Sequence, residues 1–97
     1  MTYYLHPDAE QDLREAAEFY QKRAGSDLAL AFISEFEYSI GLLLAHPALG
    51  ALWRNDRRRF IMRRFPYSLI YNVEDQQIRV LAVAHHSRRP VYWRDRN

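Results

Sequence analysis

The hydrophobic period of this chain changes once, after Gly50, and that change restricts the fold more than any other feature of the sequence. Between residues 7 and 46 the apolar residues recur every three or four positions, as on one face of a helix. From residue 57 to residue 85 they alternate with polar residues, as in half-buried strands. A length of 97 residues with 48% hydrophobic content is enough for one core. We therefore predict a single α+β domain over residues 1–97 with two layers.

The first half of the chain predicts a short strand followed by a hairpin of two helices. Residues 2–5 are β-prone, and Pro7 stops this strand and suits the first position of a helix. Gly25 ends that helix, and Ser26 or Asp27 is the expected N-terminal cap of the next one, which closes at a His-Pro pair. Because the connection is short, we expect the two helices to lie side by side.

The second half predicts three strands, over residues 57–64, 67–73 and 78–85. Their short connections favour an antiparallel meander, with the helical hairpin on one face of the sheet and the other face left partly open. On the middle strand Tyr67 and Tyr71 point to the same side as neighbouring apolar residues. We therefore expect both rings to pack in the core.

Charge is strongly segregated along the chain. Residues 1–53 carry three basic and eight acidic side chains, whereas residues 54–97 carry eleven arginines and four acidic side chains. The guanidinium fork contacts phosphates or carboxylates with two hydrogen bonds, so the second half suits a polyanion or an acidic partner. The acidic face of the first helix, including Asp12, Glu15 and Glu18, is expected to be solvated surface.

The composition also argues against several classes of protein. The chain has no cysteine, which excludes disulfide scaffolds and thiolate chemistry and fits a reducing cytoplasm. We expect no signal peptide and no membrane span, since the longest apolar run, around residues 42–45, is far too short. Three glycines form no phosphate-binding loop, so no nucleotide cofactor is expected. A metal is not expected either, because the four histidines show no ligand spacing: His6, His46, His85 and His86.

Two motifs resemble a known family over nearly the whole chain. Residues 63–71 read Arg-Arg-Phe-Pro-Tyr-Ser-Leu-Ile-Tyr, and residues 82–93 contain Ala-Val-Ala-His followed by Arg-Arg-Pro-Val-Tyr-Trp. Together with the strand, acidic helix and His-Pro-terminated helix before them, they resemble the RelE/ParE superfamily of type II toxin–antitoxin toxins. The resemblance implies a growth-inhibiting toxin of bacteria. It also implies a cognate antitoxin, acidic and partly disordered, that binds the toxin directly and forms a hetero-oligomer with it.

The superfamily contains two activities, and the motifs favour one of them. RelE-like members cut mRNA in the ribosome without a metal, and ParE-like members poison DNA gyrase. The resemblance places Ser68 and His86 where the nuclease has arginines, whereas Tyr92 matches a nuclease tyrosine. The Phe-Pro-Tyr turn and the Tyr-Trp ending are more similar to ParE-like sequences, so a gyrase inhibitor is the leading hypothesis. The alternatives are the mRNA endonuclease and an inactive toxin-derived module that only binds an antitoxin.

Candidate site residues come from the arginine- and aromatic-rich second half, since both residue types are enriched at binding hot spots. Those expected to bind the target or antitoxin are Trp53, Arg59, Arg64, Arg88, Arg89, Tyr92 and Trp93. If the protein is a nuclease, the expected catalytic residues are His86, Tyr92 and Arg64. Two open alternatives remain: Tyr92 and Trp93 form a lid over the core instead, and His85 is a structural histidine.

Overall fold

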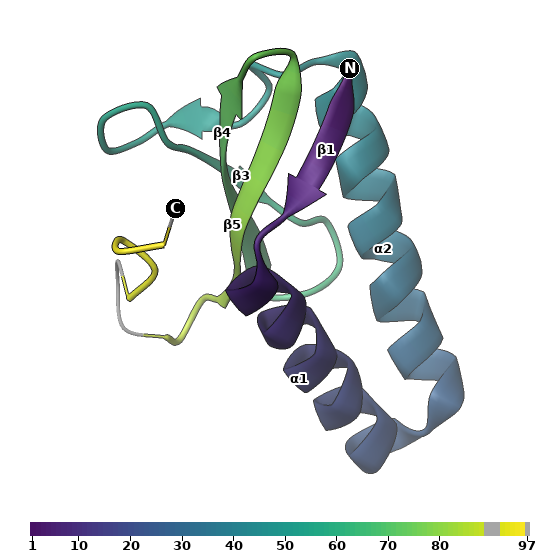
Figure 1. Cartoon of the computed structure of the whole chain (residues 1–97). Helices are drawn as coiled ribbons and strands as arrows, with labels where there is room; N and C mark the ends of the chain where they lie inside the picture. Colours follow the sequence, from purple (N-terminus) through teal and green to yellow (C-terminus); the bar gives the residue numbers. More distant parts are fainter. Residues whose placement is uncertain (89–91, 97) are drawn as a thin grey trace.

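The computed structural model describes residues 1–88 and 92–96. Two helices form a hairpin beside one face of a twisted sheet, and the chain ends on the sheet's other side (Figure 1). The elements in chain order are β1 (Thr2–Leu5), α1 (Pro7–Ala24), α2 (Ser26–Ala45), β2 (Ala51–Leu52), β3 (Arg58–Ile61), β4 (Tyr67–Glu74) and β5 (Gln77–His85). The strand order is β1-β5-β4-β3-β2. This order confirms an α+β domain with two layers.

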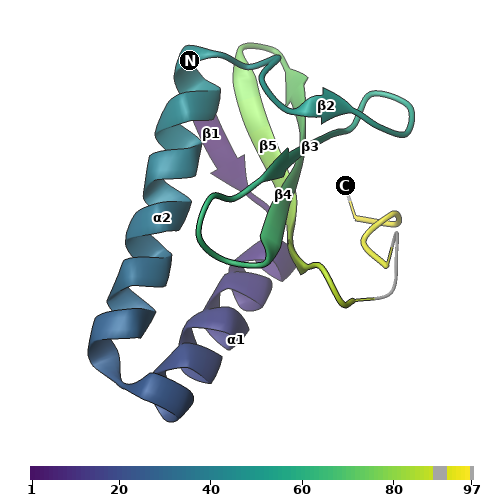
Figure 2. The same cartoon turned by 180° about the vertical axis from the view of Figure 1, so that it is seen from behind.

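The sheet is mixed and has more strands than the predicted meander. Strands β3, β4 and β5 are antiparallel neighbours, as expected. Strand β1 adds to the edge in parallel, from Thr2 beside Gln77 to Leu5 beside Val80. The helical hairpin first returns the chain, and the two antiparallel reversals from β3 to β4 and from β4 to β5 then give β5 the direction of β1. On the other edge, β2 pairs with β3 over only two residues, which is too short for a recognisable alternating pattern. Figure 2 shows both edges from behind.

Gly25 joins the two helices and corrects the predicted cap. Its φ of +90° is in the region that favours glycine, and its N–H donates to the carbonyl of Gln21 at the end of α1. The same residue precedes α2, whose first helical residue is already Ser26. A side-chain cap from Ser26 or Asp27 was therefore a wrong prediction, because one glycine serves both helix ends in this tight connection.

The main core lies between the helices and the sheet and is rich in aromatic rings. Phe32 of α2 packs against Phe65 and Tyr67, with ring centroids 5.2 and 5.0 Å apart. Tyr67 and Tyr71 are both buried, which confirms their predicted core position. Among the described residues, α2 has the length and mean hydropathy (1.6) of a membrane-spanning helix. In this fold its apolar face is instead accounted for by core packing.

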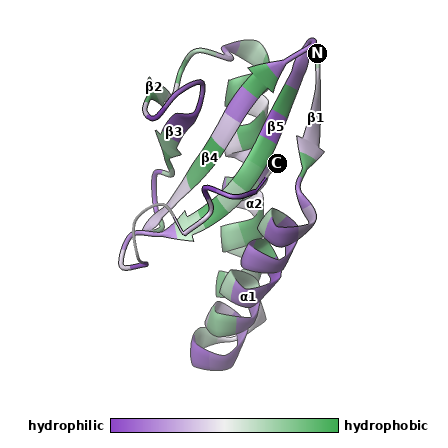
Figure 3. Cartoon of the chain, turned by 60° about the vertical axis from the view of Figure 1, so that its left-hand side comes forward, coloured by the Kyte–Doolittle hydropathy of each residue, from purple (hydrophilic) through white to green (hydrophobic). Residues whose placement is uncertain are grey.

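The opposite face of the sheet is covered in part by the end of the chain. Residues 92–96, which we call the tail segment, lie over β4 and β5 (Figure 3). Trp93 forms a small buried cluster there with Ile70 and Ala82. The buried Trp93 ring fits the lid alternative, and the face stays open only in part, where Ser68 and Ile70 line a hollow beside the tail segment.

Candidate functional site

A hollow of about 210 Å³ opens beside the tail segment, on the side of the sheet away from the helices. Its floor includes Ser68 and Ile70 of β4. Five of the predicted binding residues line it: Trp53, Arg59, Arg88, Tyr92 and Trp93. We call it the aromatic hollow. Residues from the loop after β2, from β3 and from the chain end therefore meet at one place, as a shared binding site requires.

The two remaining predicted binding residues do not belong to this group. Arg64 does not line the hollow; it lies exposed between β3 and β4, with its guanidinium 5.5 Å from the centre of the Phe65 ring. Arg89 lies outside the described residues. The predicted nuclease set is therefore divided, since His86 and Tyr92 line the hollow without Arg64.

Aromatic rings support the cations around the hollow. The Trp53 and Trp93 rings meet edge to face, with centroids 5.4 Å apart. The guanidinium of Arg59 lies 5.6 Å from the Trp53 ring, and that of Arg88 lies 4.0 Å from the Tyr92 ring. Trp53 is 36% exposed whereas Trp93 is 2% exposed, so Trp53 is accessible to a partner and Trp93 supports the wall from inside.

The two adjacent histidines make different contacts. His86 Nε2 lies 3.0 Å from Ser68 Oγ, which also accepts a hydrogen bond from Arg59 Nε at 3.2 Å. Burial, and then the positive charge of Arg59, lower the pKa of His86, which favours a neutral ring near pH 7. His85 Nδ1 accepts from the N–H of Ser87 at 3.0 Å, an arrangement that fits the structural alternative for this histidine.

Tyr92 is held by Asp12 of α1, a residue expected to be solvated. The Tyr92 hydroxyl donates to Asp12 Oδ2 at 3.4 Å, and burial, followed by the negative charge of Asp12, raises the pKa of Tyr92 to about 12. Asp12 is only 7% exposed, so the prediction of a solvated face was wrong for this residue, whereas Glu15 and Glu18 are exposed as predicted. Asp12 shares the buried face of α1 with Ala9 and Ala16, three and four positions away. This helical spacing was the signal in the sequence that could have identified Asp12 as buried.

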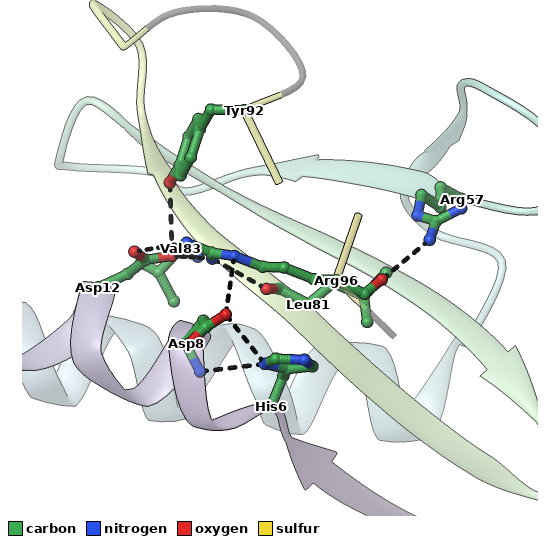
Figure 4. Close-up of polar contacts among 8 residues, drawn as sticks. All are labelled: His6, Asp8, Asp12, Arg57, Leu81, Val83, Tyr92 and Arg96. Atoms are coloured by element: carbon green, nitrogen blue, oxygen red, sulfur yellow. Dashed lines mark hydrogen bonds and ion pairs between the residues drawn. The ribbon is translucent and has the colours of Figure 1, made fainter. Parts of the chain in front are cut away.

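Arg96 is the second residue that sequence reasoning missed. Its Nη1 donates to Asp12 Oδ2 at 2.7 Å and to the carbonyl of Leu81 at 3.1 Å, and its Nη2 reaches Asp12 Oδ1 at 3.4 Å (Figure 4). Its Nε lies 3.7 Å from Asp8. No local pattern distinguishes Arg96 from the ten other arginines of the second half, so only the fold reveals its partner.

The hollow combines cationic, aromatic and imidazole side chains. Within residues 1–88 and 92–96, no group of three His, Asp or Glu side chains is placed to hold a metal ion. The hollow presents guanidinium groups, indole and phenol rings, and a histidine bonded to a serine. Such a set is suited to holding an anionic or aromatic surface.

Comparisons with known proteins place the chain in a family. The family model described as the ParE toxin of the type II toxin–antitoxin system, parDE, matches residues 3–90. A solved structure described as "Chromosomal ParDE TA system from P. aeruginosa" superposes with a TM-score of 0.78 at 20% identity, over 88% of this chain and 95% of that chain. No curated protein sequence matches significantly. The structural likeness shows the fold, and the family match shows membership: this chain belongs to the ParE toxin family of type II toxin–antitoxin systems, whose toxins have an antitoxin as partner.

Proposed function

We propose that this toxin arrests bacterial growth by binding DNA gyrase through the aromatic hollow and trapping a cleaved-DNA state. The observation that carries the proposal is the gathering of Trp53, Arg59 and Arg88 around one concavity, with each guanidinium close to a ring. Arginine and aromatic side chains in a pocket are the usual anchors of protein interfaces. Binding of this kind needs affinity and shape complementarity but no proton transfer.

The state of the titratable groups favours binding over RNA cleavage. A nuclease needs a general acid near neutral pH and a cation at the reacting phosphate. Burial and the negative charge of Asp12 raise the pKa of Tyr92 to about 12, and its hydroxyl donates a hydrogen bond to Asp12, so this phenol is a poor general acid near neutral pH. Arg59 and Arg88 supply cations in the hollow, whereas the predicted Arg64 does not line it. His86 has a lowered pKa and lies within hydrogen-bonding distance of Ser68. Tyr92 and His86 are thus engaged in contacts with Asp12 and Ser68, which supports a binding role for the hollow.

The antitoxin is the second proposed ligand, and charge defines its chemistry. The eleven arginines of residues 54–97 give that half a large positive excess. An acidic, partly disordered antitoxin segment would be attracted quickly and then held by forked ion pairs. Toxin and antitoxin would form a hetero-oligomer. Because gyrase acts on DNA in the cytoplasm, the proposed site of action is cytoplasmic.

The experiment that tests the target compares gyrase and the ribosome directly. Purified toxin is expected to inhibit DNA supercoiling by gyrase or to accumulate cleaved DNA, and added antitoxin is expected to prevent the effect. Cleavage of ribosome-bound mRNA with gyrase untouched would overturn the proposal in favour of the nuclease. Absence of growth arrest on induction, with antitoxin binding intact, would instead identify a module without toxicity.

A matched pair of arginine variants tests the site. Arg88→Gln is expected to weaken gyrase inhibition roughly tenfold, because truncating an arginine anchor typically costs more than 1 kcal/mol of binding. Arg14→Gln is the control, since Arg14 forms an exposed pair with Glu10 on α1, 2.9 Å away. Dose–response curves of supercoiling inhibition measure both. Equal losses would remove the case for the aromatic hollow.

A further inference from the structure

The edge of β5 is completed by side chains where its neighbouring strand ends. Strand β1 accompanies β5 only as far as Val80. Beyond that residue, the carbonyl of Leu81 accepts from Arg96 Nη1 at 3.1 Å, and the N–H of Val83 donates to Asp12 Oδ2 at 3.0 Å. Buried backbone groups need such partners, so α1 and the tail segment take the place of a strand at this edge.

One carboxylate joins the helix, the strand and the tail segment (Figure 4). Asp12 accepts from Val83, Tyr92 and Arg96, which come from β5 and from both ends of the tail segment. The side chains of Asp12 and Arg96 are only 6% and 15% exposed. A pair this well shielded is strongly coupled, because removing one partner leaves the other charge buried without compensation.

The tail segment is also held from the opposite side. Arg57 Nη2 donates to the main-chain carbonyl of Arg96 at 3.1 Å, and its guanidinium lies 6.0 Å from the Trp93 ring. Trp93 packs on Ile70 between these anchors. The position of Tyr92 and Trp93, and hence one wall of the aromatic hollow, therefore depends on contacts made at Arg96.

We propose that Asp12 and Arg96 are positioning residues of the target-binding site: through their ion pair, α1 fixes the tail segment and thereby the aromatic wall of the hollow. This inference rests on the proposed function in one respect, namely that the aromatic hollow is the binding site. Asp12 does not line the hollow, so its effect on toxicity passes through the tail segment. A buried ion pair is a weak source of net stability, and fixing a segment's geometry is the role that this pair fulfils.

The test is a series of variants at Arg96 with a neighbouring arginine as control. Arg96→Gln removes the charge, Arg96→Lys keeps it without the fork, and Arg94→Gln changes an exposed arginine of the same segment. Toxicity, measured as growth arrest on induction, is expected to fall about tenfold or more with Arg96→Gln, since a charge-assisted hydrogen bond is lost. It is expected to fall less with Arg96→Lys and to stay unchanged with Arg94→Gln.

A second readout separates positioning from general stability. In a Trp53→Phe background, fluorescence quenching by acrylamide reports on Trp93, which is shielded in the native fold. Arg96→Gln is expected to expose this ring while far-UV circular dichroism of the helices is retained. Full growth arrest in Arg96→Gln, or lost arrest with Trp93 still shielded, would overturn the inference.

Further variants keep the inference testable if Arg96→Gln does not fold. Asp12→Asn retains an acceptor for the Val83 N–H but removes the charge, and it is expected to reproduce both effects. The double variant of Asp12→Asn and Arg96→Gln is expected to lose no more toxicity than either single variant, because both substitutions remove the same contact. Additive losses of toxicity would contradict a shared role. Growth arrest does not depend on the identity of the target. If the unmodified toxin arrests growth without inhibiting gyrase, the proposed target fails while this series still decides the positioning role.

Discussion

The two faces of the sheet are built on different physical principles. On the helix side, an extended apolar cluster joins α1 and α2 to β4 and β5. On the tail side, the described residues contain a cluster of only three buried side chains, and the covering segment is anchored by the Asp12–Arg96 pair. Apolar burial resists local opening, whereas a short segment anchored by a few polar contacts opens at lower cost. The helix side is a scaffold, and the proposed binding site lies where the structure is held less firmly.

The largest expected effect contrasts one aromatic residue from each side. Phe32→Ala is expected to lower the free energy of unfolding by about 3–5 kcal/mol, because it leaves a cavity in the main core. Trp93→Ala is expected to cost less stability while abolishing growth arrest, since the tail segment can detach without unfolding the helices. Urea unfolding and induction assays measure the two quantities. Leu30→Ala, at a position that is 63% exposed, is the control for Phe32→Ala.

If Trp93→Ala destabilises the protein as much as Phe32→Ala does, the tail segment is part of the scaffold. The contrast between the two sides would then be wrong.

The next effect concerns Gly50, which lies against a ring of the main core. A Cβ at Gly50 would lie 2.7 Å from Tyr71 Oη, and that hydroxyl accepts from the Gly50 N–H and donates to the carbonyl of Pro47. Gly50→Ala is expected to cost about 1–3 kcal/mol of unfolding free energy through overpacking. Gly41→Ala is the control, because a Cβ there meets nothing within 4 Å and alanine favours the helix.

Thermal unfolding monitored by circular dichroism distinguishes the two glycine variants. Each kcal/mol corresponds to a shift of roughly 4–8 °C in the midpoint for a domain of this size. An unchanged midpoint in Gly50→Ala would show that the loop before β2 yields easily. In that case the main core would be less rigid than the comparison requires.

The helix side was predictable from the sequence because its apolar residues recur at a regular spacing. The apolar spacing of α1 and α2, the turn at Gly25 and the alternation around Tyr67 each follow a period that local structure imposes. The tail side has no such period. Trp93 could be predicted as either a lid or a binding residue. Asp12 and its partner Arg96 are 84 positions apart in sequence, so only the folded chain brings them into contact.

A smaller effect is expected at Glu35, which anchors the turn after β3 to α2. Arg63 donates two hydrogen bonds to its carboxylate, at 2.8 and 3.0 Å, and these bonds lower the pKa of Glu35. A lowered pKa means that the pair stabilises the fold fully above the unfolded value, near 4.3, and that this contribution is lost as pH falls through the folded pKa.

Glu35→Gln is therefore expected to cost about 1 kcal/mol at pH 7, since the Arg63 side chain is 55% exposed and partly screened. It is also expected to flatten the loss of stability below pH 5. Urea unfolding at a series of pH values measures both. An identical pH profile in the variant and the unmodified protein would show that the pair contributes nothing to the scaffold.

The smallest expected effect is a pH dependence on the tail side. Because the pKa of His86 is lowered in the fold, the unfolded chain takes up a proton first as pH falls below about 6.5. Stability contributed by the neutral ring is then lost, and a charged ring is placed beside Arg59. NMR titration of the His86 ring is expected to give a pKa below that of a model peptide. A value at or above it would contradict the burial of this ring near the positive charge of Arg59.

The most direct test of the central claim is to map where gyrase contacts the toxin, by hydrogen–deuterium exchange of the toxin alone and bound to gyrase. We predict slower exchange at residue 53, at residues 86–88 and in the tail segment, with the amides of α1 and α2 unchanged. Protection confined to the helical hairpin, or no protection anywhere, would contradict the account.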